Sequence, residues 1–358
     1  MRVKLKDITK FSKGTQINGK NLIDDGAYSY LNGGIKPSGK WNEFNVAENT
    51  VTISEGGNSS GYVNYMNEAF WCGAHCYYLY DGPKNSKYLY YALKSQQERL
   101  FRIRSGACMP NIKKSDLGNF IIEYEKDEVR QEEVVKVLEK CELLIEDYNK
   151  KLALLDEAVR ARFVEMFGDE NNSKGWEIVN IEDVANVQVG VVIKPSQYYT
   201  DQYNGIKAFR SLNIGDGYIK DDDWVYFSKE GNKKNKKSIL STNDVLVVRS
   251  GAPGTACVVT SEYAGSNAID VIIAHPDFQK VDSRYLCTYT NMPHGKSQII
   301  EGTGGAAQQH FNVGKYNKLK LMLPPLEYQK QYVKFLEEID KSRLLSNHSL
   351  FLTKSIIF

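Results

Sequence analysis

RQEEVVKVLEKCELLIEDYNKKLALL, residues 130–155, returns 198 residues later in altered form as YQKQYVKFLEEIDKSRLLSNHSLFLT, residues 328–353. Identical residues fall in one register across both stretches, as Gln131 and Gln329 do. Chance seldom preserves one register over such a span, and a repeat on this scale points to a duplicated architecture. Shorter matches lie upstream in the same order. We therefore predict two copies of a variable domain, each followed by a helix.

The first repeat carries the pattern of a long helix. Residues 127–167 contain no Gly or Pro, and 41 residues of helix would span roughly 60 Å. Apolar positions step by four and three residues, which is a heptad seam. The seam of the first repeat is Val134, Leu138, Cys141, Ile145, Tyr148, Leu152, Leu155 and Val159. The second repeat has a matching seam of Tyr332, Leu336, Ile339 and Leu350. The polar residues Arg343 and Ser346 occupy the seam positions in its middle, so the apolar pattern is weaker there.

Two amphipathic helices from one duplicated chain favour an antiparallel intramolecular coiled coil; the alternative is that each helix packs on its own domain. Short strands between Gly, Asn, Asp and Ser turns make up the remainder. The predicted fold is α+β: two tandem β-rich domains separated by two long antiparallel helices. The expected boundaries are 1–126 and 170–326 for the domains, 127–169 for the first helix, and 327–358 for a shorter second helix.

Composition limits the function classes. The chain has 358 residues and a formal net charge of +2, which excludes a uniformly basic nucleic-acid binder and a highly charged disordered chain. No apolar stretch is long enough to cross a membrane, and the first residues lack the apolar core of a signal peptide. We expect a cytoplasmic protein without membrane association, in which the six cysteines are reduced.

The charge is unevenly distributed. Residues 84–114 carry a net charge of +7 and residues 229–237 carry +4, whereas the helix at 127–167 carries −4. A concentrated basic stretch in each domain is what phosphate contact requires; the alternative is a solvated surface run without a ligand. The acidic helix suits contact with proteins and would repel phosphate.

Several short motifs are candidates for recognition. Residues 244–255 read as a strand entering a Gly-rich turn that presents Arg249 and Ser250, and neither a P-loop nor a Rossmann fingerprint is present. The first-half counterpart, residues 54–61, presents small polar groups. Gln308 and Gln309 could pair with adenine edges or could simply lie in a polar loop.

The sequence offers little support for a metal centre or for catalysis. The motif Cys72-Gly-Ala-His75-Cys76 could supply three zinc ligands, but a structural site normally has four, so a packed strand is favoured. The sequence contains no evident Ser/His/Asp set and no Asn-Pro-Pro-aromatic methyltransferase tetrad. We therefore predict neither catalytic residues nor a bound metal.

Taken together, the motifs resemble those of the specificity (S) subunit of type I restriction–modification systems. LLDEAVRARFVEMFGD at 154–169 is similar to the end of the family's central conserved helix, and LPPLEYQ at 323–329 is similar to the entry to its second helix. RSLNIGDG at 210–217, VVRSGAPGT at 247–255 and NGGIKPSG at 32–39 resemble segments of its target-recognition domains. Two departures are a degraded Pro-Pro-Leu-Glu counterpart at 123–128 and the shorter second helix.

The resemblance implies a non-catalytic reader in which each domain recognises one half of a split DNA site. Two methylation subunits would dock along the helices, restriction subunits would join them, and S-adenosylmethionine, ATP and Mg²⁺ would be bound by these partners rather than by this chain. Two alternatives remain: a self-sufficient nuclease or methyltransferase, and a coiled-coil adaptor that binds no DNA. The candidate DNA contacts are Lys36, Lys40, Ser54, Asn58, Arg99, Arg102, Arg104, Arg210, Lys233, Lys234, Lys236, Lys237, Arg249, Ser250, Gln308 and Gln309.

Overall fold

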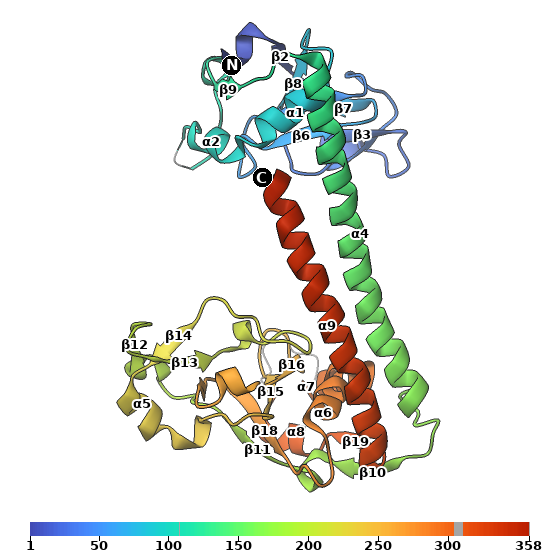
Figure 1. The fold of residues 1–358 in the computed structure, drawn as a ribbon, viewed down its shortest axis with the longest axis vertical. Coiled ribbons are helices and arrows are strands. Elements are labelled where there is room, and N and C mark those ends of the chain that lie inside the picture. The colour runs from blue at the N-terminus through green and yellow to red at the C-terminus, as the bar shows by residue number, and fades with distance from the viewer. Residues whose placement is uncertain (107, 304–310, 358) are drawn as a thin grey trace. The chain divides into compact units, whose positions relative to one another are not determined.

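The computed structural model describes residues 1–106, 108–303 and 311–357 (Figure 1). The chain forms two compact units. The first comprises Met1–Lys151 with Ser346–Phe358, and the second comprises Leu152–Leu345. Each long helix therefore contributes to both units. Among the described residues, none of the helices is long and apolar enough to cross a membrane.

The first unit contains a four-stranded antiparallel sheet of order β2-β8-β5-β6. A second sheet has the order β4-β3-β7, in which β3 and β7 run parallel, and β1 pairs with β9. The strands are β1 Arg2–Lys4, β2 Lys10–Lys13, β3 Tyr28–Leu31, β4 Gly39–Trp41, β5 Thr50–Ser54, β6 Val63–Met66, β7 Phe70–Cys72, β8 Cys76–Tyr80 and β9 Ile121–Glu123. The short helices are α1 Ser86–Lys94, α2 Gln97–Arg102 and α3 Lys114–Gly118.

The second unit repeats this arrangement. Its main sheet has the order β11-β18-β15-β16, its second sheet β12-β14-β13-β17 with β13 and β17 parallel, and β10 pairs with β19. The strands are β10 Glu177–Asn180, β11 Ala185–Val189, β12 Tyr199–Thr200, β13 Ile206–Phe209, β14 Val225–Phe227, β15 Val245–Val248, β16 Ala256–Val258, β17 Asn267–Ala268, β18 Val271–Pro276 and β19 Lys320–Leu323. The helices are α5 Lys229–Lys234, α6 Ser283–Asn291, α7 Pro293–Thr303 and α8 Val313–Asn317. The matching sheet orders confirm the predicted duplication.

The two long helices are α4, Glu128–Phe167, and α9, Leu326–Ile357. At 32 residues against 40, α9 is the shorter, as expected. In the second unit the start of α9 lies antiparallel to the end of α4: the Tyr332 hydroxyl donates to the Val159 carbonyl at 3.1 Å, and Arg343 forms an ion pair with Asp156 (Figure 1). This confirms the antiparallel pair of helices.

The burial pattern of the helices follows the predicted seam with one correction. Leu138, Ile145, Leu152, Leu155 and Val159 are half-buried, and Leu336, Ile339 and Leu350 are buried. Val134, however, is 41 % exposed, and the half-buried residue at this level is Val135. A heptad seam steps by either three or four residues. On the N-terminal side of Leu138 the step is three residues, to Val135, and not four residues, to Val134.

An aromatic cluster fixes α4 and α9 to the second unit. Phe163 and Phe167, one turn apart near the end of α4, are fully buried, and their rings lie 5.8 Å and 4.8 Å from the Tyr285 ring of α6. Tyr332 of α9 contacts both phenylalanines edge-on at 5.5 Å and 5.4 Å. Such aromatic pairs add stabilisation beyond the area that they bury.

A repeated buried glutamine links each long helix to the chain that enters it. Gln131 donates through Nε2 to the Glu125 carbonyl at 2.6 Å, and Gln329 donates to the Pro324 carbonyl at 2.8 Å. Both amides are at least 97 % buried. A buried carbonyl left without a partner would cost about 1–3 kcal/mol. The identity at the 198-residue offset therefore has a structural role.

Candidate nucleic-acid interface

The basic stretch of the second domain lies at the surface. Lys233, Lys234, Lys236 and Lys237, which we call the lysine loop, are all exposed, in α5 and the 3₁₀ turn Lys236–Ser238. Ser228 caps α5 by accepting from the Gly231 N–H at 3.0 Å, and Asn232 donates to Asn267 Oδ1 at 2.8 Å. In the described part of the chain no ion pair to these lysines is found. The loop therefore presents four cations on a fixed backbone.

The basic stretch of the first domain is divided between two roles, which corrects its interpretation as one surface. Lys94 is buried: its ammonium donates to the Val63 carbonyl at 3.1 Å and lies 3.7 Å from the centre of the Tyr62 ring. Lys87 lies 3.8 Å from Glu142 and 4.0 Å from Glu139 of α4. Lys84 also lies 3.8 Å from Glu128 of α4. Three lysines of the +7 run are thus used inside the first unit, two of them to neutralise part of the acidic helix.

The arginines of this stretch are partly packed on aromatic rings. Arg99 and Arg102 are exposed, and the Arg99 guanidinium lies 5.2 Å from the Phe120 ring. Arg104 is half-buried with its guanidinium 4.0 Å from the Phe101 ring. Arg99 and Arg102 therefore remain accessible to a phosphate, whereas Arg104 is largely committed to packing.

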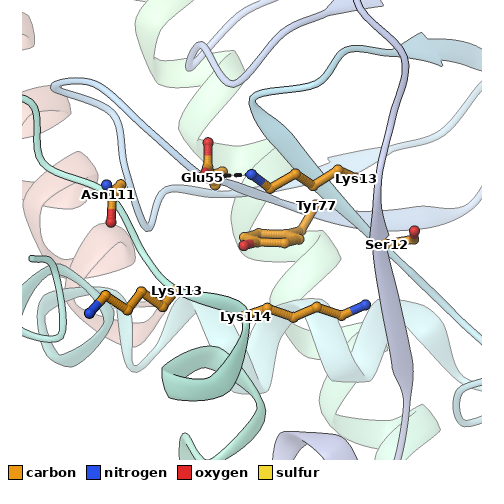
Figure 2. A pocket seen from close by; sticks show the side chains of 7 residues that line it. All are labelled: Ser12, Lys13, Glu55, Tyr77, Asn111, Lys113 and Lys114. Atoms are coloured by element: carbon orange, nitrogen blue, oxygen red, sulfur yellow. Dashed lines mark hydrogen bonds and ion pairs between the residues drawn. The ribbon is translucent and has the colours of Figure 1, made fainter.

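A hollow of about 580 Å³ lies beside the end of β5 in the first unit (Figure 2). Of the residues that line it, Glu55 accepts through Oε1 from Lys13 Nζ at 2.7 Å. Lys113 and Lys114 extend in opposite directions from the start of α3 (Figure 2). Burial, and then the nearby Glu55 carboxylate, raise the pKa of Tyr77 to about 12, so its hydroxyl stays protonated and donates to the Ile112 carbonyl at 3.2 Å. The sequence prediction missed Glu55 and Lys13, although Glu55 stands in the Gly-rich turn.

Arg249 does not project into solvent as predicted for the tip of a hairpin. Its side chain is 14 % exposed, Nη1 lies 2.5 Å from Asp270 Oδ1, and Nε donates to the Phe311 carbonyl at 3.1 Å. Ser250 is half-buried and has an interaction of its own. Two partners distant in sequence hold the guanidinium in one orientation.

Ser54 is not accessible, which corrects its assignment as a DNA contact. It is the last residue of β5, it pairs with Cys76, and only 1 % of it is exposed. Arg210 is also committed, because its Nη2 lies 3.1 Å from the Asp223 carboxylate. Of the other candidates, Lys36, Lys40 and Asn58 are exposed, whereas Gln308 and Gln309 lie outside the described residues.

Cys72 and Cys76 pack inside the first unit. Both are buried, and the Cys72 thiol lies 3.4 Å from the Cys76 carbonyl. The interaction with Cys76 and then burial raise the pKa of the Cys72 thiol, which opposes the thiolate form that a metal would need. Among the described residues there is no group of three His, Cys, Asp or Glu side chains that could hold a metal ion.

The chain is similar in sequence to known specificity subunits. A putative type I specificity subunit of Mycoplasma pneumoniae is 38 % identical over 149 residues, which cover 41 % of this chain and 40 % of that protein. The MjaVIII specificity subunit of Methanocaldococcus jannaschii is 22 % identical over 271 residues, covering 71 % of this chain and 63 % of the relative. The chain thus spans about 40 % of the length of the Mycoplasma relative and less than two thirds of the archaeal one.

The fold has a counterpart among solved structures. The crystal structure of a type I restriction–modification S subunit from M. genitalium aligns with all of this chain and 93 % of its own, with a TM-score of 0.62 and 19 % identity. The family model described as the type I restriction modification DNA specificity domain matches residues 1–156 and 173–350. The two matches together cover nearly the whole chain, one for each copy of the duplicated domain, and the chain therefore belongs to the family of type I restriction–modification specificity subunits.

Proposed function

We propose that this chain is the DNA sequence-recognition subunit of a type I restriction–modification complex, and that each β-rich domain reads one half of a bipartite target. The observation that carries the proposal is the duplication itself: one sheet order occurs twice with different charged and polar groups at the surface. A scaffold repeated with altered surface groups suits two related ligands that differ in detail, as two half-sites do.

Phosphate contact would come from the lysine loop in the second domain and from Arg99 and Arg102 in the first. All of these cations are exposed. Each phosphate that a cation neutralises releases condensed counterions, which drives binding irrespective of base sequence. Such contacts position a protein on the duplex, whereas base edges in the grooves supply specificity.

The long helices would set the distance between half-sites and dock the methylation subunits. In the first unit several large apolar side chains of these helices face solvent: Leu143 is 62 %, Phe351 70 % and Ile356 60 % exposed. Exposed apolar groups on a helix are a common feature of protein interfaces. We propose that these residues contact a methylation subunit.

In this proposal the chain contributes recognition and no catalytic residue. Two methylation subunits would use S-adenosylmethionine to methylate adenine, and restriction subunits would use ATP and Mg²⁺ to translocate and cut DNA. We place the complex in the cytoplasm, with the DNA that it reads. The proposed function involves no membrane.

The deciding experiment is methylome sequencing of a host with and without the gene, in the presence of its methylation subunit. We expect a bipartite motif, with a fixed gap, that is methylated only when this chain is expressed. Methylation at a continuous motif, or at none, would refute the proposal. The purified chain, incubated alone with DNA and either S-adenosylmethionine or Mg²⁺, should neither modify nor cut the DNA; activity in this assay would make the chain an enzyme.

A further inference from the structure

Glu55 in the first domain and Arg249 in the second occupy the same place in the duplicated fold. Each follows directly on a central strand of its main sheet, β5 or β15. The Glu55 carbonyl accepts from the Ile112 N–H at 2.9 Å, and the Arg249 carbonyl accepts from the Phe311 N–H at 3.2 Å. The donors themselves stand at equivalent points, two residues before α3 and α8.

The partners of these two side chains also correspond in position, but Glu55 is a carboxylate that faces an imidazole, whereas Arg249 is a cation that faces a carboxylate. His75 and Asp270 each stand one residue before the strand, β8 or β18, that pairs with β5 or β15. His75 Nδ1 lies 3.5 Å from Glu55 Oε2, and Asp270 Oδ1 lies 2.5 Å from Arg249 Nη1. The first domain has its carboxylate after the central strand, and the second domain has its cation there.

The surroundings change together with the charge. Lys13, Lys113 and Lys114 line the hollow beside Glu55 (Figure 2). Nearby phosphates would repel a carboxylate in a DNA groove, and neighbouring cations offset that repulsion. Arg249 needs no such support, because a guanidinium is attracted to phosphate. The equivalent positions in the second domain, taken from the pairing of β2 and β11 and from the starts of α3 and α8, are uncharged: Val189, Asn312 and Val313.

Both side chains are held in one orientation and keep an edge at the surface. Glu55 is 17 % and Arg249 14 % exposed at the side chain, and each is paired with an opposite charge, Lys13 for Glu55 and Asp270 for Arg249. Fixed polar edges are what base recognition needs. A carboxylate accepts from the amino group of cytosine, whereas arginine donates to O6 and N7 of guanine.

We infer that Glu55 and Arg249 are equivalent specificity positions, through which the first domain selects a base that presents an amino donor and the second selects guanine. The inference rests on the proposed function, since it assumes that each domain reads one half-site. Beyond the proposed function, it names the residue in each domain that discriminates between bases. It also states whether the selected base presents a hydrogen-bond donor or acceptors to that residue.

The test uses the full chain with its methylation subunit, S-adenosylmethionine and a plasmid library with randomised half-sites. Glu55→Gln keeps the shape of the side chain and adds a donor, so we expect discrimination at one base pair of the first half-site to fall by about tenfold or more. The second half-site should be unchanged. Arg249→Gln should have the reciprocal effect. Glu123→Gln, at an exposed position on β9 of the first domain, is the matched control and should change neither half-site.

A double variant tests the hydrogen-bond polarity while keeping an ion pair. Glu55→Arg with His75→Asp places the arrangement of the second domain in the first, and we expect the preferred base at one position of the first half-site to become guanine. Unchanged preferences in both single variants, or the wild-type base retained in the folded double variant, would show that these pairs only tie the strands together. If wild-type protein yields no bipartite motif, the proposed function itself fails, whereas a wild-type motif with unresponsive variants overturns this inference alone.

Discussion

If the long helices act as a ruler, lengthening both should lengthen the gap in the DNA target. The perturbation is a duplication of residues 145–151 after Lys151 in α4 and of residues 339–345 after Leu345 in α9. These are the points at which each helix passes from one compact unit to the other. A heptad returns the apolar seam to nearly the same face, with a drift of about 20°. The packing inside each unit is therefore kept.

The expected change in the gap follows from helix geometry. Seven residues at about 1.5 Å each add roughly 10.5 Å to either helix. B-DNA rises about 34–36 Å for each turn of 10–10.5 base pairs, so the added length corresponds to about three base pairs. Those base pairs also rotate the second half-site by roughly 100° about the DNA axis. Accommodating that rotation will slow methylation of the longer site.

The assay is methylome sequencing of a host that carries the variant and its methylation subunit. A duplication in α4 alone is the control, because it lengthens one helix against an unaltered partner. We expect this single insertion to abolish methylation. If α4 keeps its contacts in the second unit, Val159 with Tyr332 and Asp156 with Arg343, then its residues before the insertion are shifted by seven positions relative to the end of α9 in the first unit. An active double insertion that methylates the original motif would refute the ruler.

Three further outcomes are expected. Alanine at all four positions of the lysine loop should weaken binding to every DNA sequence and lower the slope of log K against log salt by about 0.9 for each phosphate that the loop neutralises; an unchanged slope in a fluorescence titration would remove the loop from the interface. Phe163→Ala should destabilise the second unit by about 3–5 kcal/mol in a denaturant titration, because a fully buried ring is removed; a destabilisation below about 1 kcal/mol would contradict the role of the aromatic cluster. Hydrogen bonds from Lys207 and Trp224 lower the pKa of Asp221, so its contribution to stability is present above the ordinary carboxyl pKa and is lost as the pH falls through the lowered value. Asp221→Asn should therefore lower the melting temperature at pH 7, and the difference from wild type should shrink as the pH falls below the ordinary carboxyl pKa; a difference that does not change with pH would exclude the charge as the cause.

Local periodicity made the long helices predictable. A stretch without Gly or Pro and with one apolar stripe determines a helix before any partner is known. Which residue of a helix is buried depends on the element that packs against it, as Val134 and Val135 illustrate. Both are valines, both fit a step to Leu138, and only the surroundings of α4 determine that Val135 lies on the seam.

The binding surface was harder to predict, because the accessibility of a cation depends on partners distant in sequence. Lys94 is satisfied by the Tyr62 ring and the Val63 carbonyl, residues of the neighbouring sheet. Lys87 lies 3.8 Å from Glu142 of α4, which is distant from it in sequence. The net charge of residues 84–114 indicated a basic stretch, but it could not separate structural cations such as Lys94 from those available to a ligand, such as Arg99 and Arg102.

The duplication separates the two kinds of residue, because each copy serves as the reference for the other. Gln131 and Gln329 are identical, and each donates from a buried side chain to a carbonyl of the segment that enters its helix, so a role in folding accounts for them. Glu55 and Arg249 are held by the same backbone hydrogen bond at the same point, yet their charges are opposite. An ion pair that only ties two strands together needs one matched partner, as Arg249 has in Asp270. Here the three lysines beside Glu55 have no charged equivalents beside Arg249, and this coordinated change is what different ligands at the two positions would require.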